Sequence, residues 1–299
     1  MRVRRVVVAI GLVTTVLAGC GHSPRRGLDA AAPRLTFSYN TSQPLGYVDR
    51  GVVAHRGSIA VHDIAYVSGG ERVDAYLVER PGRPRRPGIV LVHGSGGDRR
   101  ELLDAAGALA ERGTVAMTVT EPSAAHPPLA PAGAGAFLAQ SRAVTVRDVI
   151  AVRRAADILA SMPIVDPSRI GYLGWSAGAK TGAFVAASDR RFKALVLLSG
   201  GADKLAAFVA AAPARLRPLV KRQLGSVDPL RYIAWASPGT LLLEDGTRDA
   251  VVPRRALLNM IRAAPRRTLV HWYPAGHRLN AAAYRDAFAW LVTKLSASA

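Results

Sequence analysis

The sequence predicts one α/β domain, built on a mostly parallel, doubly wound sheet with an antiparallel hairpin on its N-terminal side. Two observations lead to this fold class. Short runs of continuous apolar residues alternate with segments in which apolar residues recur every three or four positions. The chain of 299 residues is 49 % hydrophobic and 20 % charged, which suits one folded domain and excludes general disorder.

The first residues, 1–19, have the layout of a secretory signal. Arg2, Arg4 and Arg5 precede an apolar stretch, Val6–Leu17, that is too short to cross a bilayer with margin. The segment closes with Leu-Ala-Gly before Cys20 and resembles the lipobox of bacterial lipoproteins. That resemblance implies a diacylglyceryl group on Cys20, and attachment to the outer face of a bacterial membrane. The alternative is a plain cleaved signal followed by an incidental cysteine.

Residues 20–34 are polar and contain proline and glycine, so we expect a tether there and a folded domain over 35–299. Cys20 is the one cysteine of the chain, which excludes an intrachain disulfide and a cysteine metal cluster. The formal net charge of +19 could attract nucleic acid, anionic lipid or acidic glycans. Because the basic residues are scattered and form no aromatic-rich motif, we expect no nucleic-acid partner.

The domain begins with a predicted hairpin. Ile59–Val67 and Arg72–Val78 read as two strands, joined at Gly69 and Gly70. Further strand-like runs follow at Ile89–Val92, Thr114–Val119, Arg169–Gly174, Lys193–Leu198, Thr240–Leu243 and Thr268–Trp272. Their alternation with helical patterns favours one doubly wound sheet over two domains.

Two stretches show the apolar spacing of a helix. One contains Val149, Val152, Ala156 and Leu159, and the other contains Tyr284, Phe288, Leu291 and Leu295. Residues 121–140 and 200–236 interrupt the alternation, and we expect both at the sheet edge where ligands bind. The second segment is predicted either as a cap over the site or as an ordinary crossover helix with surface.

The strongest chemical signal is the sequence Gly-Trp-Ser-Ala-Gly around Ser176. It follows a predicted strand and opens a helix of small residues. A serine hydroxyl needs exposure beside a base to act as a nucleophile, and a tight strand-to-helix turn provides that exposure. The start of the helix also directs free N–H groups, including that of Ala177, toward a developing oxyanion.

Candidates for the base and the acid follow downstream, each just past a predicted strand. His277 would take the serine proton, and Asp249 would orient its imidazole. Asp245 is the rival acid. His93 ends the strand before the glycine-rich sequence at 94–97 and is an alternative base, although a role in shaping that loop is favoured.

These motifs together resemble the α/β-hydrolase superfamily. The sequences VDPSRIGYLGWSAG, DGTRDAVVP and AGH are similar to the dienelactone-hydrolase-like and acyl-esterase branch, over residues 59–296. The resemblance implies the α/β-hydrolase fold, the Gly-x-x-Asp turn at Asp249, and an oxyanion hole made by the amides of Ser95 and Ala177. Two departures are present. Dienelactone hydrolases use a cysteine nucleophile where this chain has Ser176, and a bulky Lys180 lies where many relatives carry a small residue.

The sequence therefore predicts an extracytoplasmic serine hydrolase of small carboxylic esters that needs no cofactor. Lipase, thioesterase and peptidase chemistry on the same triad remain open, because one fold hosts them all. A surface lipoprotein that binds without catalysis is the alternative from another class. Seven scattered histidines offer no metal-binding spacing, and no phosphate-binding glycine loop is present. The oligomeric state is left open.

Overall fold

The computed structural model describes residues 36–82, 85–125 and 133–297. The predicted signal peptide, the tether and Cys20 lie outside these residues, and their interpretation stays a prediction. Within the described ranges, no helix combines the length and the hydropathy that crossing a membrane requires.

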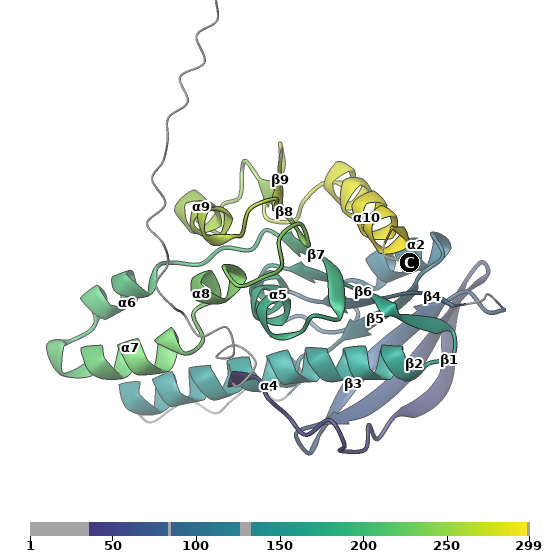
Figure 1. The fold of residues 1–299 in the computed structure, drawn as a ribbon, viewed down its shortest axis with the longest axis horizontal. Helices are drawn as coiled ribbons and strands as arrows, with labels where there is room; N and C mark the ends of the chain where they lie inside the picture. Colours follow the sequence, from purple (N-terminus) through teal and green to yellow (C-terminus); the bar gives the residue numbers. More distant parts are fainter. Residues whose placement is uncertain (1–35, 83–84, 126–132, 298–299) are drawn as a thin grey trace, which may run out of the picture.

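One nine-stranded sheet organises the chain (Figure 1). Its strands are β1 (Val48–Arg56), β2 (Ile59–Ser68), β3 (Glu71–Glu79), β4 (Arg86–Val92), β5 (Val115–Val119), β6 (Val165–Trp175), β7 (Phe192–Leu198), β8 (Leu241–Gly246) and β9 (Leu269–Tyr273). They lie in the order β1-β2-β3-β5-β4-β6-β7-β8-β9. The pairs from β1 to β5 are antiparallel, and the pairs from β5 to β9 are parallel. The predicted fold class, an α/β-hydrolase fold with N-terminal antiparallel strands, is confirmed.

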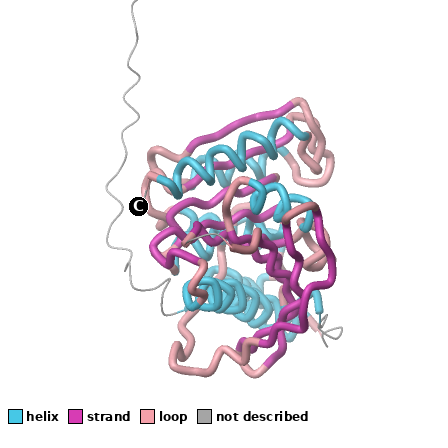
Figure 2. The backbone as a smooth tube through the Cα atoms, turned by 90° about the vertical axis from the view of Figure 1, so that its right-hand side faces the viewer, coloured by secondary structure: helices cyan, strands magenta, loops and turns pink. Residues whose placement is uncertain are grey.

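Helices cover both faces of this sheet (Figure 2). One face carries α2 (Leu103–Glu111) and α10 (Ala281–Ser296). The other carries α4 (Ala134–Ser161), α5 (Ala177–Ser188), α8 (Pro229–Ile233) and α9 (Arg254–Ala263). The doubly wound arrangement places the carboxyl ends of the parallel strands along one edge, where loops can gather chemical groups.

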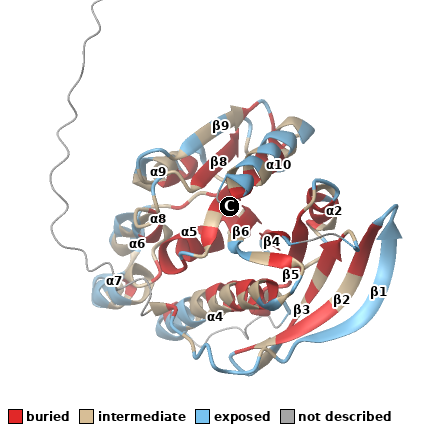
Figure 3. Cartoon of the chain, turned by 45° about the vertical axis from the view of Figure 1, so that its right-hand side comes forward, coloured by how far each residue is buried: buried red, intermediate tan, exposed pale blue. Residues whose placement is uncertain are grey.

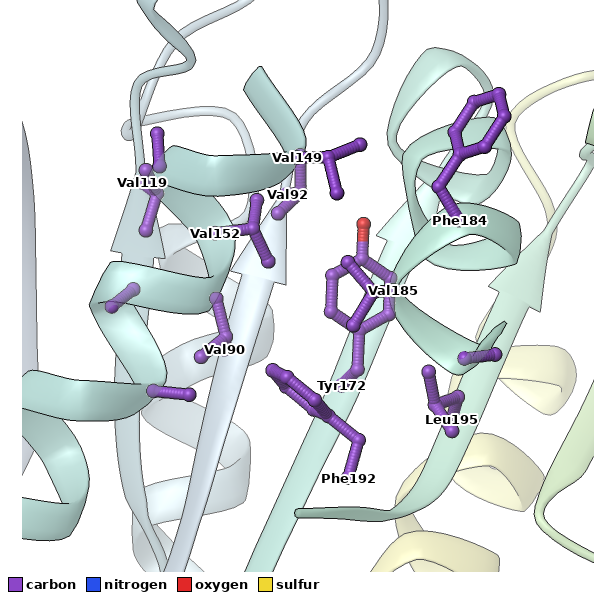
Figure 4. Packing of buried hydrophobic residues seen from close by; sticks show 14 of the residues in the cluster. Val90, Val92, Val119, Val149, Val152, Tyr172, Phe184, Val185, Phe192 and Leu195 are labelled. Atoms are coloured by element: carbon purple, nitrogen blue, oxygen red, sulfur yellow. The ribbon is translucent and has the colours of Figure 1, made fainter. Parts of the chain in front are cut away.

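Two apolar cores result, one on each side of the sheet. Along β4, Val90 belongs to the core under α4 and α5, whereas Ile89 belongs to the core under α2 and α10. Figure 4 shows Val149 and Val152 of α4 packed over the strands beside Val90. Burial on both faces explains the unbroken apolar runs of the central strands, and each fully buried Val or Leu stabilises the fold by about 1.5–3 kcal/mol.

The predicted hairpin is present as β2 and β3, joined at Gly69 and Gly70. Both glycines have positive φ, 61° and 84°, as a tight turn matching the twist of the strands requires. The buried hydroxyl of Tyr66 donates to the carbonyl of Ala151 at 2.8 Å, which ties the hairpin to α4.

Two elements differ from the prediction. The strand β1 was not expected, because it forms the sheet edge with all its residues exposed and so lacks an apolar stripe (Figure 3). Residues 121–140 were expected to interrupt the alternation of strands and helices, but they contain the short helix α3 (Pro122–Ala125) and the start of α4 at Ala134. Gly133, with φ 86°, turns the chain into an alanine-rich stretch without proline, and such a stretch favours a helix.

The segment 200–236 contains α6 (Leu205–Ala211), the 3-10 turn η1 (Ala214–Leu216), α7 (Arg217–Gly225) and α8. The part from 204 to 227, here called the cap, lies on the N-terminal part of α4. Leu219 of α7 would be 3.6 Å from a β-carbon at Gly135, and Arg142 of α4 donates to Ser226 Oγ at 3.0 Å. The chain then returns to the core through Tyr232 and Ile233 of α8.

Candidate active site

Ser176 lies in the turn between β6 and α5, with φ 55° and ψ −107°. Such a backbone is rarely adopted by a residue with a side chain, and it holds the hydroxyl above the end of the sheet. The turn is fixed by close approach on both sides. A β-carbon at Gly174 would lie 2.4 Å from the carbonyl oxygen of Gly178, and one at Gly178 would lie 2.3 Å from that of Val92. Both flanking positions of the motif therefore require glycine.

The three residues proposed for nucleophile, base and acid lie together. His277 Nε2 is 2.9 Å from Ser176 Oγ, and His277 Nδ1 is 2.8 Å from Asp249 Oδ2. The side chain of Asp249 is 1 % exposed and that of His277 is 12 % exposed. The hydrogen-bonded chain thus runs from a buried carboxylate to a hydroxyl at the edge of the sheet.

Backbone amides hold the carboxylate of Asp249 in place. The other oxygen of Asp249, Oδ1, accepts hydrogen bonds from the amides of Val251 and Val252 at 2.8 and 2.9 Å. An ionised Asp249 leaves Nδ1 of His277 as the donor in their pair, so Nε2 presents its lone pair to the serine hydroxyl. This is the tautomer that a general base needs.

Asp245, the rival acid, lies at the end of β8 and makes no hydrogen bond with His277. It is buried, and its Oδ2 has no hydrogen-bond partner among the described residues. Burial, together with the nearby charge of Asp249, raises the pKa of Asp245 to about 7. The geometry favours Asp249 as the partner of His277, and the catalytic roles themselves stay predictions.

Ser95 and Ala177, predicted to form the oxyanion hole, both line one cavity. Within the described part of the chain, no acceptor is present for the backbone N–H of either residue. The amide of Gly178 donates to the carbonyl of His93 at 3.0 Å, which holds the two loops side by side. Two free amides on adjoining loops can stabilise a negative oxygen.

His93 occupies a structural position. Its buried ring donates from Nδ1 to the carbonyl of Gly94 at 2.6 Å, and Nε2 accepts from the amide of Glu121 at 3.2 Å. Both ring nitrogens are engaged with backbone groups, so the ring shapes the glycine-rich loop, as the favoured interpretation of the sequence held.

Sequence reasoning did not identify the groups that hold the backbone of His277. The indole N–H of Trp175 donates to the carbonyl of His277 at 3.0 Å, and Ser199 Oγ donates to the same oxygen at 2.9 Å. Trp175 is buried, and its indole also fixes the loop that carries His277, here called the loop of the base.

A second support joins the loop of the base to the glycine-rich loop at 94–97, here called the oxyanion loop. It consists of Glu101 and Arg278 and is here called the Glu101–Arg278 bridge. Glu101 accepts from the amide of Gly94 at 2.9 Å through Oε2, and from Arg278 at 2.6 Å through Oε1. The Arg278 guanidinium lies 4.6 Å from the ring centroid of Trp175. Glu101 and Arg278 are 177 positions apart, and nothing in the local sequence of either residue signals the pair.

The cavity beside Ser95 and Ala177 measures about 960 Å³. Apolar side chains from α6, α7 and the loop after β8 line part of it, and four carboxyl groups also lie in the wall, those of Glu121, Asp148, Asp203 and Asp228. Thr181 Oγ1 donates to Glu121 at 2.8 Å. Burial, and then the charge of Asp148, raise the pKa of Glu121 to about 8.

Metal binding finds no support in the described ranges, where no cluster of three or more His, Cys, Asp or Glu side chains is arranged to hold an ion. The hydroxyl, imidazole, carboxylate and free amides gathered around Ser176 are groups of the kind that acyl transfer uses.

Sequence comparison matches residues 135–297, more than half of the chain, to the prolyl oligopeptidase family. No curated protein matches the chain at a significant level.

Solved structures agree with the fold at low sequence identity. Acetyl xylan esterase 1 from Thermoanaerobacterium is 14 % identical with a TM-score of 0.71, covering 88 % of this chain and 92 % of that one. A cold-adapted esterase from an Arctic intertidal metagenomic library is 17 % identical with a TM-score of 0.60, covering 86 % and 99 %. A putative dienelactone hydrolase from Klebsiella pneumoniae is 17 % identical with a TM-score of 0.60, covering 80 % and 99 %.

Proposed function

Because the chain belongs to the prolyl oligopeptidase family and has the α/β-hydrolase fold, we propose that it hydrolyses carboxylic esters through Ser176. The observation that carries the proposal is the hydrogen-bonded chain from Asp249 through His277 to Ser176. Two of the similar solved structures are esterases by name, an acetyl xylan esterase and a cold-adapted esterase. This supports an ester over other acyl substrates.

The proposed mechanism is that of a serine hydrolase with an acyl-enzyme intermediate. Ser176 Oγ attacks the ester carbonyl carbon while its proton moves to His277 Nε2, and Asp249 stabilises the imidazolium. The amides of Ser95 and Ala177 donate to the oxyanion. The C–O bond of the ester breaks as the imidazolium gives its proton to the leaving alcohol. Water, deprotonated by His277, then attacks the acyl-serine. The bond between the acyl carbon and Ser176 Oγ breaks as the imidazolium returns its proton to Oγ, and the acid is released.

Replacement of Ser176 tests this proposal. Ser176→Ala should abolish turnover of a small activated ester, while its thermal unfolding stays close to that of the wild type. A fluorophosphonate probe should label the wild type and leave the variant unlabelled. Retention of wild-type turnover by Ser176→Ala would overturn the assignment of the nucleophile. Absence of labelling in the folded wild type would favour a binding protein without catalysis.

A peptidase activity is the second candidate, because the matching family is that of prolyl oligopeptidase. The triad and the two amides suit an amide carbonyl as well as an ester carbonyl. A panel of ester, thioester and peptide substrates with the purified protein separates these activities. A higher kcat/KM on a peptide than on every ester would move the assignment to a peptidase.

We also propose that the protein works outside the cytoplasm, anchored by lipid on Cys20. The support is the sequence alone: the basic start, the apolar stretch Val6–Leu17 and the residues Leu-Ala-Gly before Cys20. Two acyl chains give a stable anchor where one holds only marginally. Intact-mass analysis should find a diacylglyceryl mass on Cys20, and Cys20→Ser should release or misprocess the protein. An unmodified Cys20 in protein cleaved elsewhere would exclude the anchor and leave the hydrolase assignment standing.

A further inference from the structure

Large apolar side chains are exposed at the rim of the active-site cavity. Phe137 of α4 is 55 % exposed, Phe208 of α6 is 48 % exposed, and Val251 after β8 is 67 % exposed. All three line the cavity that adjoins Ser95 and Ala177. One exposed apolar residue is ordinary, but three from separate segments around one entrance indicate a surface for an apolar partner.

The helix α6 extends this apolar rim. All seven of its residues, Leu205–Ala211, are apolar, and none of them is buried (Figure 3). The inner side of the cap contributes Leu205, Leu224 and Val227 to the wall of the cavity. Within the cap, α6 therefore presents an exposed apolar surface next to the apolar wall of the cavity.

The charge of the cap has one sign. Between residues 204 and 227 the chain carries five exposed cations and no carboxylate; the cations are Lys204, Arg215, Arg217, Lys221 and Arg222. The acids at its two ends are engaged elsewhere. Asp203 pairs with Arg255 at 3.1 Å, and Asp228 accepts from the amide of Leu230 at the start of α8. The cap is thus a cationic surface with an apolar helix beside the cavity entrance.

We propose that the cap and the rim dock on an anionic lipid surface, and that the ester cleaved at Ser176 is an amphiphile drawn from that surface. Apolar side chains enter the boundary between headgroups and acyl chains, and Lys and Arg pair with anionic headgroups. A nucleic acid or an acidic glycan would engage the cations and leave Phe137, Phe208 and α6 in water, so the apolar rim favours lipid. The substrate half of this proposal rests on the esterase function, and the docking half does not.

Hydrogen exchange of the full-length chain with vesicles tests the docking locally, whatever the N-terminus does. Vesicles containing phosphatidylglycerol should slow amide exchange in peptides from 204–224 by about threefold or more, and pure phosphatidylcholine vesicles should not. High salt should weaken the protection. This protection should be lost in the triple variant Lys204→Gln/Lys221→Gln/Arg222→Gln. The matched control, Arg262→Gln/Arg266→Gln/Arg267→Gln, removes three exposed cations at and after the end of α9 and should keep it.

Three results would overturn the docking. They are no protection of residues 204–224 by anionic vesicles, equal loss of that protection in both triple variants, or equal protection of the same residues by heparin or DNA. Ester hydrolysis tests the other part of the proposal, the class of substrate. A fluorescent long-chain ester should be cleaved faster in anionic vesicles than in zwitterionic ones, and the cap variant should lose this difference while cleaving a soluble ester normally. Equal rates in both vesicles would overturn the substrate class. Failure to cleave any ester, with the cap still protected, would reject the esterase function and leave the docking in place.

Discussion

Asp245 lies at the end of β8 and Asp249 four residues later in the following loop, but only Asp249 is hydrogen-bonded to His277. Asp249→Asn should keep the fold and lower kcat by on the order of 10⁴, because an amide at this position favours the wrong imidazole tautomer. Asp245→Asn should cost far less, since a neutral amide replaces a buried carboxyl whose pKa is already about 7. Steady-state kinetics of both variants on one activated ester at neutral pH measures the difference. If Asp245→Asn proves the more damaging, the acid lies four residues upstream.

The Glu101–Arg278 bridge gives a second prediction at this scale. Arg278→Gln removes the charge that holds Glu101 and the cation that stacks on Trp175, so the oxyanion loop and the loop of the base lose a shared support. Since small misplacements in a catalytic array are costly, we expect kcat to fall by about tenfold to a hundredfold with little change in KM. Arg100→Gln, which breaks the exposed pair with Asp98, is the matched control. Equal effects of the two substitutions would mean that the bridge has no positioning role.

At the scale of the element, the contact between the start of α5 and the end of β4 depends on the missing side chain at Gly178. Gly178→Ala should lower the free energy of unfolding by about 3 kcal/mol, because its β-carbon would lie 2.3 Å from the backbone oxygen of Val92. The same substitution at Gly135, in the first turn of α4, meets only Leu219 at 3.6 Å. Gly135→Ala should therefore be neutral or stabilise by up to about 1 kcal/mol. Urea denaturation of both variants tests the pair, and a wild-type stability for Gly178→Ala would contradict the close approach.

Most of the elements that the sequence predicted are buried. The central strands and the apolar faces of α4 and α10 have the patterns that burial imposes, and Ser176 and Asp249 each follow such a strand. His277 follows β9, which was also predicted although it is largely exposed. The sequence carried no comparable signal for β1, since no face of an exposed edge strand has to be apolar. The start of α4 was missed because alanine and glycine are common to loops and helices. The Glu101–Arg278 bridge forms only in the tertiary fold, between two charged residues far apart in the sequence. No pattern in the sequence around either residue predicts it.

For the whole molecule, buried carboxyls set how stability depends on pH. Burial raises the pKa of Glu244 from 4.5 to about 8 and that of Asp245 from 3.8 to about 7. Between about pH 4 and pH 8 the unfolded chain therefore binds fewer protons than the folded one, and the free energy of unfolding falls as pH rises, by at most about 1.4 kcal/mol per pH unit for each group. Asp189 acts in the opposite direction. Its burial is outweighed by the hydrogen bonds of Arg191, which lower its pKa, so its contribution is lost as pH falls below about 4.

The protein should accordingly be most stable in mildly acidic solution, near pH 5. Urea denaturation at pH 5 and pH 8 should give the higher free energy of unfolding at pH 5. The double variant Glu244→Gln/Asp245→Asn should narrow that difference, because neither replacement ionises, and the amide introduced in place of Glu244 keeps an oxygen that can accept from Tyr273. A wild type that is equally stable at both values would show that these carboxyls are ionised in the folded protein.

The edge strand β1 has a consequence for how copies of the chain meet. Its pairing with β2 is irregular at two places, between Asp49 and Val52 and between Val52 and Ala54. Such bulges bend a strand and interrupt the regular row of N–H and C=O groups that a second strand would need as a template. The exposed Val48 and Val53 are therefore carried on an edge that resists growing into a larger sheet. This irregularity makes the edge strand β1 a poor template for pairing with another copy of the chain, and so disfavours aggregation through this edge.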